Sequence, residues 1–231
     1  METANFRPPR ERGGRLSRVF GAAGIAPEGA PVVCALIILA AFSLLLGWHV
    51  LALLFVTCAV GASLFFRDPQ RQPPVSDKAV VSAADGRVVE VRQATLSQEQ
   101  QDFTLVGVFM SLLDVHINRA PVAGQVVETK HTAGDFKAAF RDSAATHNER
   151  NLVLICGNDG RRYAIMQIAG YLARRIVCLV QAEQSVAKGT RIGLIMFGSR
   201  VDHYLPPDCR VTVRVGDHVR AGETVIAEFE Q

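Results

Sequence analysis

The chain has 231 residues, of which 49% are hydrophobic and 20% are charged, and its formal net charge is only +3. This length suits one ordinary domain with an added segment, and so weak a charge does not favour a nucleic-acid-binding protein. A short basic stretch before an apolar block usually faces the cytoplasm and anionic headgroups, so we predict a basic tail over residues 1–30 and no nucleic-acid partner. The arginines of this tail are Arg7, Arg10, Arg12, Arg15 and Arg18.

The five cysteines fit neither a metal site nor a disulfide framework. Two lie in the apolar block and three are widely spaced, without a C-x-x-C or a paired Cys/His spacing: Cys34, Cys58, Cys156, Cys178 and Cys209. An odd, scattered set argues against disulfides and against a structural zinc site. We therefore expect idle or buried thiols in a reducing compartment, and no metal ion.

Residues 31–66 form an apolar run in which His49 is the one strongly polar side chain. A spanning helix needs about 20 apolar residues, so this run is too long for one helix and slightly short for two. A turn at Gly47-Trp48-His49 would make it a membrane helical hairpin that spans or dips into the bilayer. Arginines flank both ends, which predicts that both ends face the cytoplasm. A cleaved signal peptide fits poorly, because the run is too long and lacks a small-residue cleavage site at its end.

From residue 67 to residue 231 the chain changes to short apolar segments separated by turn residues, a pattern typical of β-strands. Asp85-Gly86 is expected to form a turn between two of these strands. Strands are predicted over residues 80–81, 87–91, 103–110, 151–156, 162–168 and 175–180.

The C-terminal part repeats a turn-and-valine rhythm. Residues 213–227 resemble the half-motif of lipoyl- and biotinyl-type β-sandwiches, and residues 185–193 are a looser copy. The glycines of such a pattern supply turns and the valines between them supply core positions. We therefore predict a mostly β (α+β) fold, a lipoyl/biotinyl-like β-sandwich domain with an N-terminal membrane helical hairpin.

The Gly198-Ser199 dipeptide, between the two half-motifs, could cleave its own backbone. A serine hydroxyl can attack the carbonyl of the preceding residue, and glycine there permits a close approach because it has no Cβ. β-Elimination of the resulting ester, followed by tautomerisation and hydrolysis, would leave a pyruvoyl group. The G-x-S-x-G pattern of a hydrolase nucleophile is absent. Taken alone, Gly-Ser is a common dipeptide and most often a turn.

The segments around Ser199 resemble the phosphatidylserine decarboxylase family, in its short branch. Arg191-Ile192-Gly193 and Phe197-Gly198-Ser199-Arg200 look like the processing site of that family. Ala83 stands where the family usually has a proline. Three further segments agree in order and spacing: residues 81–88, 113–121 and 167–176. Together the four segments are specific, although each alone is weak, and the similarity runs from about residue 60 to the C-terminus.

The resemblance implies that the backbone is cut between Gly198 and Ser199. Residues 67–231 would form the pyruvoyl-dependent decarboxylase domain, divided into a large chain of residues 1–198 and a small chain of residues 199–231. Ser199 would be the internal nucleophile and would become the pyruvoyl group. No metal and no external cofactor would then be needed.

The resemblance also assigns a base and an acidic residue. His116 would take the proton of the Ser199 hydroxyl as a general base. Asp85 would hold the imidazole tautomer, as the third member of a Ser-His-Asp arrangement. Taken alone, Asp85-Gly86 is most often a hairpin turn, and His116 is most often a surface or hydrogen-bonded core histidine.

One position departs from the longer members of the family. They tend to carry a second histidine three residues after the first, where this chain has Arg119. Either His116 serves both self-cleavage and decarboxylation, or Asp114 or His147 supplies the second proton transfer. The remaining histidines are interpreted as solvated: His131, His203 and His218.

The activity implied by the resemblance is conversion of phosphatidylserine into phosphatidylethanolamine and CO₂, through a Schiff base with the pyruvoyl carbonyl. The enzyme would act on a phospholipid at the cytoplasmic face of the cell membrane, and a homodimer is left open. Phe136 and Arg141, in a stretch of apolar and basic residues, are candidates for substrate binding at the interface, as is Arg150. The alternative for that stretch is an amphipathic helix with its phenylalanines packed inward.

Two other functions remain open. An archaetidylserine-type ether-lipid decarboxylase would use the same chemistry, because the reacting amine and carboxylate are identical. A non-enzymatic, membrane-tethered lipoyl-like adaptor would need a lysine between its half-motifs. That place is taken here by Gly198-Ser199-Arg200, so the adaptor is the weaker alternative.

Overall fold

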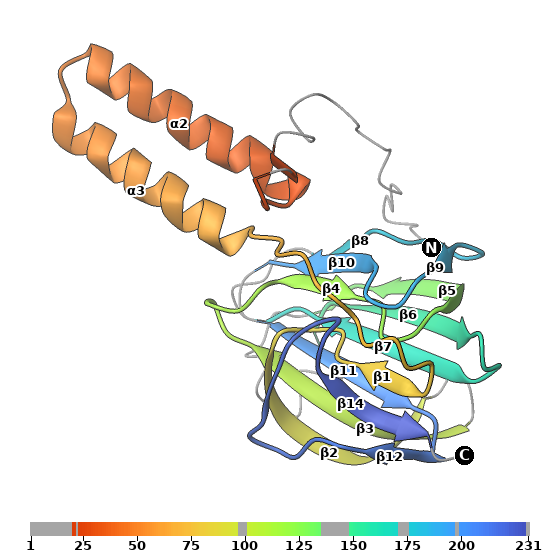
Figure 1. Cartoon of the computed structure of the whole chain (residues 1–231). Coiled ribbons are helices and arrows are strands. Elements are labelled where there is room, and N and C mark those ends of the chain that lie inside the picture. The colour runs from red at the N-terminus through yellow and green to blue at the C-terminus, as the bar shows by residue number, and fades with distance from the viewer. Residues whose placement is uncertain are drawn as a thin grey trace. The chain divides into compact units, whose positions relative to one another are not determined.

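In the computed structural model the described residues are 20–21, 23–96, 101–134, 148–170, 176–196 and 199–229 (Figure 1). The chain forms two compact units, one within residues 10–70 and one within residues 71–231. Strands make up more of the chain than helices do, which confirms the prediction of a mostly β fold.

The unit within residues 10–70 is a pair of helices joined by a tight turn. After the single 3-10 turn η1 (Pro27–Gly29) come α2 (Ala30–Leu45) and α3 (His49–Phe65). Gly47 makes the turn between them at φ +75°, a conformation that glycine adopts without strain. The helices pack through small buried side chains, which permit a close approach: Ala40, Ala52 and Ala59. The predicted helical hairpin thus forms, with its turn at the expected place.

Large apolar side chains cover the outside of this hairpin, with Leu45 at 85% and Val50 at 86% exposure. The segment Pro27–Leu45 is long and apolar enough to cross a membrane, with a mean hydropathy of 2.2, and α3 is apolar but shorter. Such a surface is unfavourable in water and favourable in lipid. Insertion of the hairpin into a membrane stays a prediction.

The unit within residues 71–231 is built from antiparallel strands. They are β1 (Ala79–Val81), β2 (Gly86–Leu96), β3 (Gln101–Met110), β4 (Ile117–Arg119), β5 (Gly124–Thr132), β6 (Arg150–Gly157), β7 (Arg162–Ile168), β8 (Ile176–Cys178), β9 (Ser185–Val186), β10 (Arg191–Ile195), β11 (Ser199–Leu205), β12 (Cys209–Val211), β13 (His218–Val219) and β14 (Val225–Phe229). Eight of them form a sheet in the order β13-β2-β3-β11-β7-β6-β5-β9, which curls into a half-barrel (Figure 1). Two smaller sheets have the orders β1-β14-β12 and β4-β10-β8.

The middle of the large sheet, around β11, is buried on both faces. Val201 and Leu205 of β11 belong to the main core, which also contains Ile192 of β10 and Ile226 of β14. Tyr204 alternates with them along the strand and packs against a second, smaller cluster. That cluster consists of Leu96, Phe103, Leu152, Leu154, Ala164, Met166 and Ile168. β11 is therefore a central strand whose side chains are buried on both sides.

The lipoyl-like arrangement is not confirmed. The strands after residue 185 are divided among all three sheets, with β11 between β3 and β7 in the largest. The half-motif does locate turns, because Gly216 and Gly222 have φ values of +101° and +75°. It does not determine which strands pair, because pairing depends on segments far away in the chain. The strand predicted over residues 175–180 is shorter, from 176 to 178.

His203, on β11, is fully buried, so the prediction that it is solvated is wrong. Its Nδ1 donates to the Val106 carbonyl at 2.9 Å, and its Nε2 accepts from the Ala83 N–H at 2.7 Å. The imidazole is therefore neutral, and burial lowers the pKa of His203 to about 4. The residues next to His203 in the sequence could not predict its burial, because its partners, Val106 and Ala83, lie 97 and 120 residues away in the chain.

Acid should destabilise the fold through His203. As the pH falls from the ordinary histidine pKa of 6.5 to about 4, the unfolded chain binds a proton that the folded protein excludes. We expect a loss of roughly 3 kcal/mol in the free energy of unfolding over this range, and a smaller loss in His203→Gln. Urea unfolding in detergent, with each protein referenced to its own stability at pH 8, measures the difference. Equal pH slopes for the two proteins would contradict this assignment.

Candidate active site

Ser199 lies where the chain passes from one sheet to another. β10 ends at Ile195 in a small sheet and β11 begins at Ser199 in the large one, so residues 196–198 connect the two sheets. Ser199 is fully buried opposite Met110, the last residue of β3. Its hydroxyl donates to the Met110 sulfur at 3.4 Å, and a thioether is a weak acceptor. The proposed nucleophile is thus shielded from water and weakly bonded, while Gly198 lies outside the described residues.

His116 lies between β3 and β4 and is 2% exposed. Its Nδ1 donates to the Asp114 carbonyl at 2.9 Å, because a carbonyl oxygen can only accept. In the neutral form with this tautomer, the basic lone pair of the imidazole lies on Nε2. The Ile195 N–H donates to the His116 carbonyl at 3.3 Å. The backbone of the proposed base is thus bonded to the end of β10, four residues before Ser199.

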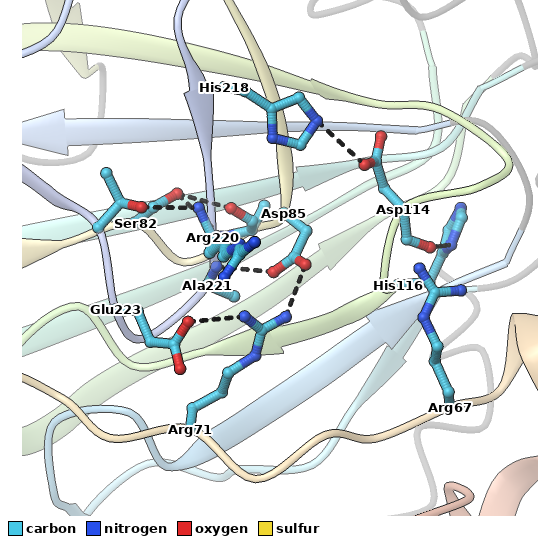
Figure 2. A network of polar contacts seen from close by, with 12 residues as sticks. Arg67, Arg71, Ser82, Asp85, Asp114, His116, His218, Arg220, Ala221 and Glu223 are labelled. Carbon is cyan, nitrogen blue, oxygen red and sulfur yellow. Dashed lines mark hydrogen bonds and ion pairs between the residues drawn. The ribbon is translucent and has the colours of Figure 1, made fainter.

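The carboxylate of Asp85 points towards Arg71 and the segment around Ala221 (Figure 2). It accepts hydrogen bonds from the Arg71 guanidinium and the Ala221 N–H, both at 2.7 Å, and Arg71 also pairs with Glu223 at 2.8 Å. Burial raises the pKa of Asp85, and these two donors offset part of the rise. The partner predicted for Asp85, the Nδ1 of His116, is bonded instead to a backbone carbonyl. A catalytic role for Asp85 stays a prediction.

Asp114 connects the turn before His116 with a distant histidine. One carboxylate oxygen accepts from the N–H and the hydroxyl of Ser111 at 2.8 and 2.7 Å, and the other lies 3.4 Å from His218 Nε2 (Figure 2). The His218 side chain is 57% exposed, so its prediction as solvated is confirmed, but the sequence did not link it to Asp114. His131 is also partly exposed and lies 3.0 Å from Glu149. His147, the other candidate for a second proton transfer, lies outside the described residues.

Arg200, directly after Ser199, makes buried ion pairs that sequence analysis missed. Its Nε bonds to Asp202 at 2.5 Å, and its Nη2 bonds to Glu90 on β2. The guanidinium lies against Gly107 on β3, where a Cβ would lie 2.6 Å from Nη2. Burial raises the pKa of Asp202, and the Arg200 charge opposes that rise. Arg200 and Asp202 are two apart on a strand and so share a face, but no local signal in the sequence identifies the partner on β2.

Three amide side chains form a second buried network that sequence analysis missed. Asn118 Nδ2 donates to Met110 Sδ at 3.7 Å, Gln167 Nε2 donates to Asn118 Oδ1 at 2.7 Å, and Asn151 Nδ2 donates to Gln167 Oε1 at 2.9 Å. All three amides are at most 1% exposed. We call Asn118, Gln167 and Asn151 the amide brace. They come from β4, β7 and β6, so no spacing in the sequence could connect them.

Of the three residues predicted to bind substrate, the structure describes Arg150. Phe136 and Arg141 lie outside the described residues. Arg150 begins β6 and is half-buried, with a 3.4 Å hydrogen bond to the Asn148 carbonyl. Within the described ranges, no three His, Cys, Asp or Glu side chains come together as metal ligands.

The family model of phosphatidylserine decarboxylase matches residues 62–227. The chain belongs to the phosphatidylserine decarboxylase family. This match confirms the sequence resemblance, since every segment that carries it lies within the matched range.

Several relatives match over nearly their whole length. A phosphatidylserine decarboxylase proenzyme of Desulfotalea psychrophila is 37% identical over 210 residues, which is 89% of this chain and 96% of the relative. One of Syntrophotalea carbinolica is 41% identical over 203 residues, or 87% and 95% of the two chains. A protein of Methanothermobacter thermautotrophicus, provisionally named an archaetidylserine decarboxylase proenzyme, is 40% identical over 207 residues, or 84% and 92%.

Replacement of Arg200 by methionine should leave Asp202 as an unpaired buried carboxylate. We expect Arg200→Met to lower the free energy of unfolding by about 3–5 kcal/mol at pH 7. The deficit relative to wild type should shrink as the pH falls, because the raised pKa of Asp202 lets the buried carboxyl become neutral. Urea unfolding at pH 7 and pH 5 measures both effects.

Arg210→Met is the matched control, because Arg210 and Glu228 form an exposed ion pair on β12 and β14. It should change the free energy of unfolding by less than about 1 kcal/mol. A deficit of the same size in both variants would contradict a special role for the buried pair.

Proposed function

We propose that this chain is a phosphatidylserine decarboxylase that cuts its own backbone between Gly198 and Ser199 and carries a pyruvoyl group at residue 199. The observation that carries the proposal is the buried hydroxyl of Ser199 at the junction of two sheets, with the backbone carbonyl of His116 bonded to the N–H of Ile195, four residues before Ser199. The names of the relatives support it, because a proenzyme is a precursor that requires processing.

Self-cleavage would begin at the Ser199 hydroxyl. Its Oγ attacks the carbonyl carbon of Gly198, the C–N bond breaks, and an ester and a free amine result. His116 accepts the hydroxyl proton through Nε2 and returns it to the amine. Removal of the Cα proton of residue 199 then breaks the Cβ–Oγ bond, which releases Gly198 as a carboxylate. The remaining enamine tautomerises, and one water molecule replaces ammonia to leave the ketone.

The surroundings of Ser199 fit this conversion. The hydroxyl is lost, and among the described residues its acceptor is the Met110 sulfur, a weak acceptor whose bond costs little to lose. Because Ser199 and His116 are both buried, proton transfer between neighbouring groups is favoured over exchange with water. The pyruvoyl carbonyl would supply the electron sink for loss of CO₂ from the substrate.

Asp85 would act as the acidic partner of His116. Burial is the main cause that raises the pKa of Asp85, and the charge of Asp114, in the turn that leads to His116, adds to the rise. A negative charge there favours the imidazolium that forms when His116 accepts a proton. The Asp114 carbonyl meanwhile holds the tautomer. His116 would also serve the second proton transfer, since Arg119 occupies the position of the second histidine.

The substrate would be a phospholipid at the cytoplasmic face of the cell membrane. Residues 31–66 would embed the hairpin, residues 1–30 would contact anionic headgroups, and residues 67–231 would form the catalytic domain. Four residues separate Phe66 from Arg71, so an embedded hairpin would tether the domain to the membrane. The relative named for archaetidylserine is the observation that keeps the ether lipid as the second candidate.

The test of self-cleavage is a denaturing gel with mass spectrometry of the small chain. Wild type should give fragments of residues 1–198 and 199–231, the latter with a ketone in place of its amino group. Ser199→Ala should remain one chain, and His116→Asn should cleave about 10²–10⁴-fold more slowly. A folded wild-type protein that stays whole would overturn the proposal. Release of CO₂ from diacyl phosphatidylserine, compared with its ether analogue, distinguishes the two lipids.

Membrane insertion is tested by alkaline carbonate extraction of cell membranes. Wild type should stay in the pellet, because a hairpin in the hydrocarbon core is held by its buried apolar area and not by charge. Two charged substitutions on the exposed apolar surface, Leu45→Lys and Val50→Lys, should reduce the pelleted fraction. Quantitative release of the wild type would show that the hairpin does not enter the bilayer.

A further inference from the structure

The amide brace joins the two sheets that carry the ends of the 196–198 segment. Asn118 lies on β4 opposite Gly193 of β10, in the small sheet. Gln167 and Asn151 face each other across β7 and β6, in the large sheet. The 2.7 Å hydrogen bond from Gln167 to Asn118 therefore crosses from one sheet to the other.

Both ends of the Asn118 side-chain amide are hydrogen-bonded, and one of its partners, Met110, also contacts Ser199. Gln167 donates to its Oδ1, and its own Nδ2 donates to the Met110 sulfur that also accepts the Ser199 hydroxyl. Asn118 also follows His116 by two residues. The brace thus contacts the neighbours of both the proposed nucleophile and the proposed base.

Packing alone does not account for three amides at this place. A buried amide loses its hydration, and the hydrogen bonds it gains do little more than compensate. Apolar side chains of similar size would fill the space without the cost of burying polar groups. The amides therefore contribute something that packing does not, namely the fixed geometry that directional hydrogen bonds impose. The close packing at Gly193 of β10 supports this interpretation, because a Cβ at this residue would lie 2.7 Å from Gln167 Nε2. The backbone of β10 therefore lies directly against the brace.

We propose that the amide brace is a positioning device for self-cleavage. It fixes β4 and β10 against β7 and β11, and so sets the position of the end of β10 relative to the start of β11, between which self-cleavage would occur. The inference rests on the proposed self-cleavage. Once the backbone is cut, no peptide connects the two strands, so the brace governs maturation of the enzyme and not its turnover.

The experiment follows full-length precursor made by cell-free translation in the presence of membranes. Gln167→Met, which keeps side-chain length and removes both inter-amide bonds, should convert to fragments at least ~10-fold and up to ~10²-fold more slowly. Decarboxylation per pyruvoyl group in the protein that does mature should change less than about threefold, since the reacting atoms are untouched. Asn151→Leu removes only the far bond and should slow cleavage less, which gives an answer even if Gln167→Met does not fold.

Two controls separate positioning from loss of stability. Gln125→Met replaces an exposed glutamine of β5 and should cleave at the wild-type rate. Leu152→Ala destabilises the second apolar cluster while the brace stays intact, and it should also cleave at the wild-type rate.

The outcomes distinguish the two proposals. If the wild-type precursor never cleaves, the proposed self-cleavage is wrong, and the role of the brace falls with it. Wild type that cleaves, with folded Gln167→Met and Asn151→Leu precursors that cleave equally fast, overturns the role of the brace. Slowing of Leu152→Ala to the same extent, or a parallel loss of decarboxylation per pyruvoyl group, would reduce the brace to a structural element.

Discussion

The passage of the chain from β10 to β11 is the constraint on which the proposed site depends. Residues 196–198 must bridge two sheets, and Ser199 is the first residue on the far side. Each end of the bridge is fixed by hydrogen bonds, Ile195 to the His116 carbonyl and Ser199 to the strand that ends at Met110. A bond that is cut here leaves both new termini held by strands, so the fold can survive the loss of its own continuity.

Three buried ionisable groups lie on β11, directly after Ser199, and each depends on its hydrogen-bond partners. The Arg200–Asp202 pair and the neutral His203 alternate along β11, so they face opposite sides of the same strand. The Arg200 charge is tolerated because it is paired with two carboxylates, Asp202 and Glu90, and the histidine because it stays neutral with both nitrogens bonded. These groups fix the start of β11 next to Ser199. The strand that begins at Ser199 is thus anchored by polar contacts on both faces.

The polar network around Asp85 joins segments that are far apart in the chain. Arg71, at the start of the β unit, bonds to both Asp85 and Glu223, and the Ala221 N–H bonds to Asp85. Residues 221 and 223 fall in the proposed small chain, while Arg71 and Asp85 fall in the large one. These contacts would therefore join the two products of the proposed cleavage. Such shared contacts would keep the domain together without a covalent link.

Much of this protein was determined by the sequence alone: the hairpin with its turn at Gly47, most of the strand positions, and the Gly198-Ser199 and His116 segments that carry the family resemblance. These features are local, since apolar runs, turn glycines and short motifs act within a few residues. Only the tertiary structure decided that His203 is buried, that Asp85 bonds to Arg71, and that Asn118, Gln167 and Asn151 form one chain of amides. Each of these depends on which distant strands pair and in which register, and register is set by packing of the whole sheet, which no single segment encodes.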